Sequence, residues 1–326
     1  MGGTKPAHRQ KKNNIQLVAA ATGLFAVTDT NSMFNFAATS TTVIALDAAT
    51  NVHRFDGTTY TATAHGGTNL RGMGASGGDG VAILGITASG TNFRVTTDFG
   101  ETFGNIAPAS TSIVWDMFCF GGYNGASTVC LAFSNVTSTT KAQRSANNCG
   151  SFADVTWTTA LIMAGGASNG GTGSGTEFLL LGQTGVTRKS TDNAATLTAG
   201  NNLPDSSTGG YLMYGGGYFV ALAANSANLY YTSSVNSAWS AAVPVPSLIP
   251  STAARGIVYL DGKYWLMDSE KQVWSTSDIT ASPVQWQLEF QLPISSFTTQ
   301  QRPFNMVKVG SYYYVAVDCR IYRIAP

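Results

Sequence analysis

The sequence predicts an all-β fold, a single seven-bladed β-propeller built from four-stranded antiparallel blades. Three observations predict it: a polar motif that returns about every 45 residues, seven apolar runs at matching places in the repeat, and a C-terminal repeat that lacks one strand. A period of this size is typical of propellers and solenoids, because each repeat has an apolar face that needs a neighbour. The 326 residues fit one such domain, since propellers are long single domains.

The recurring motif has the form Ser/Thr-x-Asp-x-Gly-x-Thr-aromatic, and its most complete copy is residues 96–103, with Asp98, Gly100, Thr102 and Phe103 at the defining positions. Weaker copies keep part of the pattern, including Asp192 and Trp239, and start at Ser145, Ser190, Thr232 and Ser275. The starts are 42 to 49 residues apart, and a shortened corner covers residues 54–60. We expect each copy to form the corner before the last strand of a blade.

The strands themselves are indicated by short apolar runs bounded by Gly, Asn, Ser and Thr. Such β-branched or aromatic runs indicate buried strands, and seven of them begin at Val43, Val81, Val129, Phe178, Phe219, Trp265 and Tyr314. A second run lies upstream of most and ends in a Gly-Gly or Asp-Gly turn, as in 117–122, 211–216 and 257–262. These dipeptides favour two-residue hairpins. A last short strand, such as 286–290, completes a four-stranded unit.

The two ends of the chain are expected to meet in one blade. The last repeat ends at residues 321–326 with no room for a fourth strand, whereas residues 15–21 and 24–27 form a spare strand near the N-terminus. We expect the N-terminal strand to complete the C-terminal blade, because closure removes exposed sheet edges. The domain organisation predicted is therefore a basic arm, residues 1–14, followed by the propeller, residues 15–326.

The corner motif resembles the Asp-box, or BNR repeat, of a family that includes sialidases, sortilin-type receptors, xyloglucan-cleaving hydrolases and a photosystem assembly factor. The resemblance covers five or six short corners between Phe55 and Trp286, and only residues 96–103 match nearly in full. It implies a folding device, in which the Asp caps the turn between the third and fourth strands and the aromatic residue packs between sheets. Asp98 and Asp192 are therefore expected to be structural. Enzymes and non-enzymes share the motif, so it does not fix function.

We expect no enzyme activity and no catalytic residues. The sialidases of that family hold a carboxylate with three Arg and use a Tyr–Glu pair with an Asp acid, and their Phe-Arg-Ile-Pro motif is missing near this N-terminus. Only four Glu occur: Glu101, Glu177, Glu270 and Glu289. Glu101 falls in a corner and Glu289 on an expected outer strand. The xyloglucan-cleaving members place their acids between two propellers, and this sequence predicts one.

A ligand-binding site is nevertheless predicted at one mouth of the central channel. Arg71, Arg255 and Arg302 each precede an expected innermost strand, in blades two, six and seven, and Trp115 and Asp116 hold the matching place in blade three. Three converging guanidinium groups would bind an anion such as an acidic sugar through bidentate hydrogen bonds. In the alternative interpretation, each Arg pairs with a neighbouring carboxylate or backbone carbonyl.

No cofactor and no metal site is predicted. Residues 72–77 match the Gly-x-Gly-x-x-Gly dinucleotide pattern, but a strand follows them where that motif needs a helix. The three His lack metal-ligand spacing. The four Cys, at 119, 130, 149 and 319, form no Cys-x-x-Cys pair, and free buried thiols are the expected state; the alternative is that Cys119 and Cys130 face each other on adjacent strands.

The basic arm carries Lys5, Arg9, Lys11 and Lys12, and no acidic residue precedes Asp29. A signal peptide is the competing interpretation, but Gln16 and Thr22 interrupt its apolar stretch and the propeller needs a strand there, so we expect the segment to be retained. We expect the arm to dock on another protein. Nucleic acid is the rival partner, and four charges without interleaved aromatic residues make a modest site for it.

These observations favour a non-enzymatic structural or adhesive subunit of a large assembly. A bacteriophage virion, in the tail or fibre region, fits best, with other structural proteins of the assembly as partners, a host surface glycan as a further one in host recognition, and no membrane span. The first alternative is a glycan-binding or glycan-cleaving Asp-box propeller that uses the channel mouth. The second is an assembly factor or an extracellular scaffold.

Overall fold

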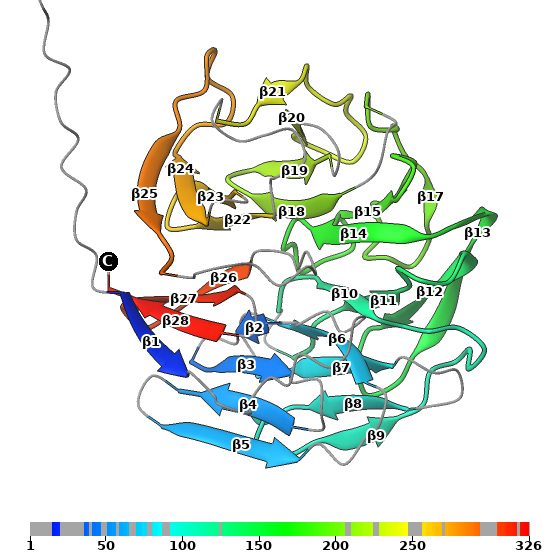
Figure 1. Cartoon of the computed structure of the whole chain (residues 1–326). Coiled ribbons are helices and arrows are strands. Elements are labelled where there is room, and N and C mark those ends of the chain that lie inside the picture. Colours follow the sequence, from blue (N-terminus) through cyan, green and yellow to red (C-terminus); the bar gives the residue numbers. More distant parts are fainter. Residues whose placement is uncertain are drawn as a thin grey trace, which may run out of the picture.

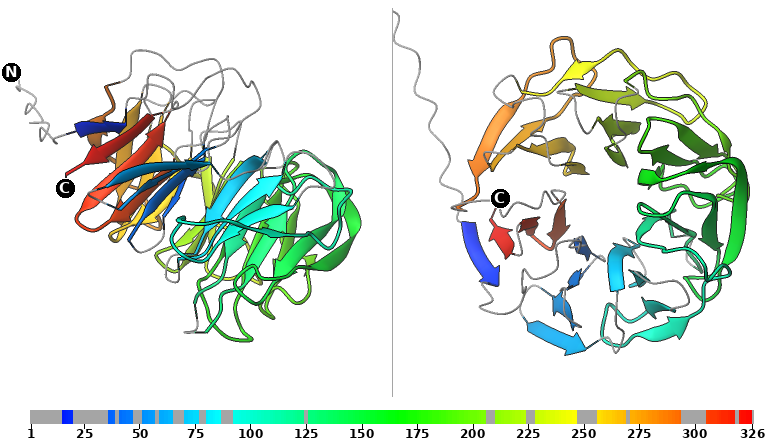
Figure 2. Two further views of the ribbon diagram at one scale, coloured as in Figure 1. Left: turned by 90° about the horizontal axis from the view of Figure 1, so that it is seen from below. Right: turned by 45° about the vertical axis from the view of Figure 1, so that its right-hand side comes forward.

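The computed structural model describes residues 15–19, 36–38, 41–46, 51–56, 59–64, 70–76, 80–86, 92–123, 126–205, 210–223, 228–246, 256–268, 271–293, 305–317 and 320–325. Within them every regular element is a β-strand, and the strands form seven four-stranded antiparallel sheets. Figure 2 shows the sheets arranged as blades around one axis. The predicted seven-bladed β-propeller is confirmed.

Six blades are continuous in sequence, each running from the innermost strand to the outermost (Figure 1). Blade one has β2 (Phe36–Ala38), β3 (Val43–Leu46), β4 (Asn51–Phe55) and β5 (Tyr60–Ala64); blade two has β6 (Leu70–Ala75), β7 (Ala82–Ile86), β8 (Phe93–Thr96) and β9 (Gly104–Ile106). Blade three has β10 (Met117–Phe120), β11 (Cys130–Phe133), β12 (Thr139–Ser145) and β13 (Ala153–Leu161).

The next three blades repeat the same order. Blade four has β14 (Met163–Ser168), β15 (Phe178–Gly182), β16 (Thr187–Ser190) and β17 (Thr198–Ala199); blade five has β18 (Tyr211–Gly215), β19 (Tyr218–Leu222), β20 (Asn228–Thr232) and β21 (Val243–Pro244). Blade six has β22 (Ile257–Leu260), β23 (Lys263–Met267), β24 (Gln272–Thr276) and β25 (Gln287–Gln291).

Blade seven joins the two ends of the sequence. Its strands are β26 (Asn305–Val309), β27 (Tyr312–Val317), β28 (Arg320–Ile324) and, outermost, β1 (Ile15–Ala19). β1 is antiparallel to β28, with Ile15 opposite Ile324 and Ala19 opposite Ile321. The innermost strand of each blade contacts that of the next, and β26 contacts β2, so the ring is closed. The N-terminal closing strand is therefore confirmed for residues 15–19, while residues 24–27 lie outside the described residues.

Close approach of the innermost strands explains several glycines. A Cβ on Gly74 of β6 would lie 2.7 Å from the Cβ of Phe118 on β10, and one on Gly215 of β18 would lie 2.3 Å from the Cβ of Tyr259 on β22. Real side chains cannot approach so closely, so the backbone itself packs against the neighbouring blade. The Gly-rich segment that resembles a dinucleotide loop thus belongs to β6 up to Ala75, as its strand-like context predicts.

The hydrophobic core lies between neighbouring sheets. One cluster joins blades two and three and includes Phe93, Trp115 and Cys130; another joins blades three and four and includes Cys119, Leu131 and Phe178. Cys119 lies opposite Leu131, and Cys130 lies opposite Phe120. Because side chains alternate between the faces of a strand, Cys119 and Cys130 occupy opposite faces of blade three. The alternative in which these two residues face each other is therefore excluded, whereas Cys119, Cys130 and Cys149 are free and buried, as expected.

Candidate functional site

The best copy of the corner motif is a closed hydrogen-bonded turn between β8 and β9. Asp98 Oδ1 accepts a hydrogen bond from the Thr96 hydroxyl at 2.6 Å and from the backbone N–H groups of Glu101 and Thr102 at 3.1 and 3.0 Å. Asp98 Oδ2 accepts from the Thr102 hydroxyl at 2.5 Å, and Thr96 Oγ1 accepts from the backbone N–H of Gly100 at 3.0 Å. The carboxylate therefore organises the turn.

Two weaker copies build the same turn. In blade four, Asp192 Oδ1 accepts from the Ser190 hydroxyl at 2.6 Å and from the backbone N–H of Thr196 at 3.0 Å. In blade three an amide replaces the carboxylate: Asn147 Oδ1 accepts from the Ser145 hydroxyl at 2.9 Å and from the backbone N–H of Ser151 at 3.0 Å. Geometry is preserved although the sequence pattern is degraded, because Asn keeps the acceptor oxygen.

These three corners also share an uncommon backbone conformation. Their fourth and fifth residues have positive φ angles, near 60° in five cases and 87° at Gly100. The pairs are Phe99 and Gly100, Asn148 and Cys149, and Asn193 and Ala194. Only glycine adopts this conformation without steric strain, so the hydrogen-bonded turn must hold the other five residues in place.

The two later corners depart from this pattern. In blade five Ser234 takes the Asp position, and its hydroxyl donates a 2.6 Å hydrogen bond to Glu177 of blade four. In blade six the corner starts at Thr276 and not at Ser275, because Thr276 lies opposite Tyr264 at the start of β23 and Asp278 accepts from the N–H and hydroxyl of Thr280. The predicted start is wrong by one residue; Ser275 instead donates to Glu289 at 2.6 Å.

The corner aromatic residues reach between sheets. Phe103 packs on the cluster between blades one and two, which includes Ile44 and Leu84. Trp239 packs on the cluster between blades four and five, and its indole N–H donates to the backbone carbonyl of Asn201 at 2.8 Å. The corners thus have the geometry expected of a folding device, and no corner side chain enters the channel pocket described below.

The predicted anion site is only partly described. Arg71 is the second residue of β6 and pairs with Gly85, so it lies within an innermost strand and not just before one. Its side chain, Arg255 and Arg302 lie outside the described residues. Trp115 is fully buried in the core, with its indole N–H donating to the carbonyl of Ser110 at 2.9 Å. It therefore faces the blade interface and is not available to a ligand in the channel.

Asp116 is also buried, and its Oδ1 accepts from the backbone N–H of Asn135 at 2.9 Å. This contact joins the start of β10 to the hairpin between β11 and β12. The position of Asp116 at the start of an innermost strand is as expected, whereas its described contact is structural.

A pocket of about 440 Å³ lies inside the ring. Five innermost strands line it, β6, β10, β14, β18 and β26, mainly through residues near the ends of the strands, such as Ala75, Phe120 and Ser168. Arg71 of β6 and Trp115, which precedes β10, stand at the opposite ends of those two strands.

The lining of this channel pocket has no charged side chain and combines apolar side chains with exposed polar atoms. Phe118, Phe120, Met213 and Tyr214 are each only partly buried, and glycines and alanines fill much of the remaining wall. The sequence reasoning missed these residues. The available signal was the aromatic composition of the runs 117–120 and 211–215, where both faces of an inner strand pack on neighbouring blades and the same residues also border the channel.

Within the described residues, every carboxylate has an interaction partner. Turn backbones or hydroxyl groups bind Asp56, Asp98, Asp192, Asp268 and Asp278. Contacts between strands, loops or blades engage Glu101, Asp116, Asp154, Glu177, Asp261 and Glu289. Asp205 also has an interaction. None of these residues lines the channel pocket.

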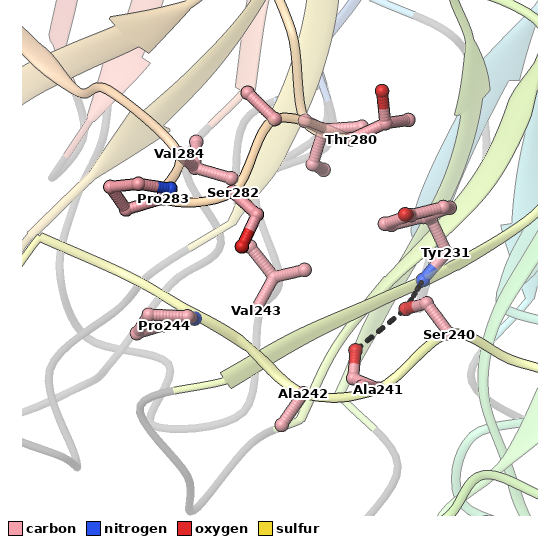
Figure 3. Close-up of a pocket in the computed structure, with 12 residues that line it drawn as sticks. Tyr231, Ser240, Ala241, Ala242, Val243, Pro244, Thr280, Ser282, Pro283 and Val284 are labelled. Atoms are coloured by element: carbon pink, nitrogen blue, oxygen red, sulfur yellow. Dashed lines mark hydrogen bonds between the residues drawn. The ribbon is translucent and has the colours of Figure 1, made fainter.

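A second, smaller pocket of about 220 Å³ lies near the rim between blades five and six (Figure 3). Residues 240–244 form one wall and residues 279–284 the other, with Tyr231 beside them. Ser240 accepts a hydrogen bond from the backbone N–H of Tyr231 at 3.1 Å and donates to the carbonyl of Ala241 at 2.8 Å. The hydroxyl of Ser240 therefore stabilises the irregular edge of blade five through these two hydrogen bonds.

Lys5, Arg9, Lys11 and Lys12 of the predicted arm lie outside the described residues. No helix in the described ranges has the length and apolar character to cross a membrane. In the same ranges, no group of three or more His, Cys, Asp or Glu side chains is placed to hold a metal ion.

The sequence matches no known protein family, and a comparison with curated proteins finds no significant relative. Solved structures share its fold. YCF48 bound to a D1 peptide has a TM-score of 0.63 at 10% identity, over 98% of this chain and 97% of that one. YCF48 from Cyanidioschyzon merolae has a TM-score of 0.59 at 12% identity, over 90% and 96%. The Dos1 propeller has a TM-score of 0.60 at 8% identity, over 87% and 75%. These similarities establish the fold alone.

Proposed function

We propose that this protein is a non-catalytic interaction scaffold that binds an apolar segment of a partner protein in its channel pocket. The observation that carries the proposal is the partly buried set Phe118, Phe120, Met213 and Tyr214 inside the ring. Aromatic and Met side chains are enriched in the centres of protein interfaces, and Met adapts its shape to different partners. A guest segment would cover apolar area that the propeller alone leaves in contact with water.

Two further observations support this proposal. The carboxylates of the described residues hold turns and strand or blade contacts, and none of them lines the channel pocket, where a carboxylate acid or base would have to meet a substrate. In addition, one protein of the same fold, YCF48, has a structure bound to a D1 peptide. A peptide is therefore the ligand class that we propose for this chain.

The wider role we propose is that of a structural or adhesive subunit in a large assembly, a bacteriophage virion in its tail or fibre region. The sequence supports it through the low charge, 11% of residues, and through the basic arm at 1–14. The arm would dock on a second structural protein through Lys5, Arg9, Lys11 and Lys12. The location would then be the virion, or the extracellular space if the chain is a secreted scaffold.

The channel part of the proposal is tested with the double variant Phe120→Ser/Tyr214→Ser and the control Tyr123→Ser. Tyr123 is 41% exposed and follows β10 outside the channel pocket. Virions that carry the wild-type or variant protein are purified on a density gradient. The amount of this protein in them is measured relative to another virion protein. We expect the double variant to lose occupancy even where it purifies as a folded monomer, and the control to keep it. Because Phe120 and Tyr214 also pack on the core, the double variant should melt at a lower temperature than wild type. Equal occupancy of all three would overturn the channel as the docking site.

The virion role and the absence of catalysis have their own tests. A chain that never migrates with a particle in the gradient would overturn the assembly role. We also expect no turnover of sialosides, xyloglucan or aryl glycosides by the purified protein. If the protein binds an acidic sugar and Arg71→Ala abolishes this binding, the result would instead favour the glycan alternative. It would also support the ligand site that the sequence predicts at the channel mouth.

A further inference from the structure

Blade three places two thiols at a pair of positions that other blades fill differently. Cys130, the first residue of β11, lies opposite Ser145, which opens the corner, and Cys149 is the fifth residue of that corner. The corresponding pairs are Ala82 with Gly100 in blade two and Phe178 with Ala194 in blade four. The repeat thus shows that the fold does not require sulfur at either position.

The two thiols are neighbours in the folded protein. Both residues are 0% exposed and belong to one apolar cluster between blades two and three. Burial, and then the neighbouring Cys149 side chain, raise the pKa of the Cys130 thiol. Asn148 joins the corner to the segment before β11, because its Oδ1 accepts a 2.7 Å hydrogen bond from the backbone N–H of Thr128, two residues before β11.

The third described thiol is excluded as a partner by the strand register. Cys119 lies opposite Leu131 and packs with it between blades three and four. A sheet therefore separates its side chain from the cluster that holds Cys130 and Cys149. Pairing within blade three is specific in this geometry.

We propose that Cys130 and Cys149 are a disulfide-forming pair, oxidised by a small disulfide of the glutathione class. One cysteine loses its proton, and its thiolate attacks a sulfur of the oxidant, which releases one thiol and leaves a mixed disulfide. The other cysteine then loses its proton, and its thiolate attacks the protein sulfur of the mixed disulfide and releases the second thiol of the oxidant. The protein gains one S–S bond, the oxidant is reduced to two thiols, and two protons pass from the cysteines to the products.

The bond would link the start of β11 to the corner between β12 and β13 within one blade. It would limit the excursions of that segment in the unfolded chain and so stabilise the folded state. Burial raises the pKa of the Cys130 thiol, so little thiolate is present near neutral pH. Oxidation is therefore slow and follows transient opening of the corner.

The test uses the full chain in oxidised glutathione, followed by alkylation, tryptic digestion and mass spectrometry. Cleavage after Arg94, Lys141, Arg144 and Arg188 yields peptides 95–141 and 145–188, which the bond would link. Because Cys119 lies on the first peptide, the matched variants are Cys119→Ala, Cys130→Ala and Cys149→Ala. We expect the linked pair in wild type and Cys119→Ala, and its loss in the other two.

A thermal readout completes the experiment. The oxidised wild type should melt about 5 °C above the reduced form, an upward shift that reductant reverses and that Cys149→Ala lacks. A linked pair that persists in Cys130→Ala would assign the bond to Cys119 and overturn the proposal. Complete alkylation of Cys130 and Cys149 after prolonged oxidation would overturn it as well.

Discussion

The Nε group of Arg144 donates a 2.9 Å hydrogen bond to the backbone carbonyl of Asn193 in the next blade. Asn193 is one of the corner residues with positive φ. The same relationship occurs between blades one and two, where Arg54 Nε donates at 3.1 Å to the carbonyl of Phe99, also at positive φ. Lys189 makes a related contact at 2.7 Å with the side chain of Asn236. A cation near the end of a third strand thus binds the following corner.

Arg144→Met should weaken the contact between blades three and four. It keeps the aliphatic stem but removes the donor, so we expect the free energy of unfolding to fall by about 1.5–3 kcal/mol, the usual scale for a hydrogen bond that involves a charged group. Arg144→Lys should lose less, because an ammonium group can still donate. Urea denaturation measures the difference, and equal stability of wild type and Arg144→Met would contradict the interpretation.

Asp98→Ala should destabilise the corner of blade two by about 0.5–2 kcal/mol, the scale for losing a side-chain cap on backbone N–H groups. Asp98→Asn should lower the stability by less, since the side-chain oxygen of Asn147 accepts the equivalent hydrogen bonds in blade three. Thermal and denaturant unfolding compare the variants. Peptide binding in the channel should be unchanged in both, and a stable Asp98→Ala variant that loses binding would show a functional role.

The corner carboxylates should make stability depend on pH in the acid range. Burial alone would raise the pKa of Asp98 and of Asp192, but hydrogen bonds from Thr102 and Thr96, and from Ser190 and Thr196, outweigh it and lower both pKa values. A lowered folded pKa means that the stabilisation is present above the unfolded value near 4 and is lost as pH falls through the folded value.

The double variant Asp98→Asn/Asp192→Asn should therefore lose less stability than wild type when pH falls from about 5 to about 2. Chemical denaturation at several pH values gives the two curves. Curves that stay parallel through this range would show that these carboxylates do not carry the acid sensitivity.

Gly215→Ala should destabilise the protein by about 1–3 kcal/mol, the usual scale for overpacking, because the new Cβ would lie 2.3 Å from the Cβ of Tyr259. The matched control is Gly175→Ala, since a Cβ there has no neighbour within 4 Å and its φ is not positive. We expect the control to change stability by less than about 0.5 kcal/mol. Melting temperatures of the two variants decide the matter.

Deletion of residues 1–19 should expose β28 and cause aggregation, because an uncovered strand pairs with other chains. Deletion of residues 1–14 is the control, since it keeps β1. Size-exclusion chromatography measures the oligomeric state. A monomeric deletion of 1–19 with an unchanged melting temperature would show that β1 contributes nothing to closure.

The blade architecture was predictable because the second strand of each blade is an apolar run and the corners carry polar residues at a nearly fixed spacing. The weak corners were harder to place, since Ser275 and Thr276 both fit the first position in sequence. Only the strand register, which sets Thr276 opposite Tyr264, distinguishes them. Likewise, Asn147 reproduces the Asp98 turn by its acceptor oxygen, which a search for aspartate does not find.

The residues that line the channel pocket could not be predicted from the sequence, for a different reason. Phe118 and Phe120 look like core residues, and they do pack partly on the core between blades two and three. Their exposure to the channel depends on how closely the neighbouring strand approaches, which Gly74 sets from 44 residues earlier. Trp115 shows the reverse case: its place in the repeat suggests a ligand contact, and packing of blade two buries it.

Closure by β1 also sets an order of events in time. During synthesis β1 emerges from the ribosome before the other strands of the ring, and its partner β28 (Arg320–Ile324) emerges after all of them. Until β28 is made, the nascent chain can form at most an open arc in which β1 has no strand to pair with. Long-range pairing of this kind is slow and leaves intermediates prone to aggregation. The rate at which cells accumulate the native ring should therefore depend on how well unpaired β1 is kept from aggregating before β28 is made.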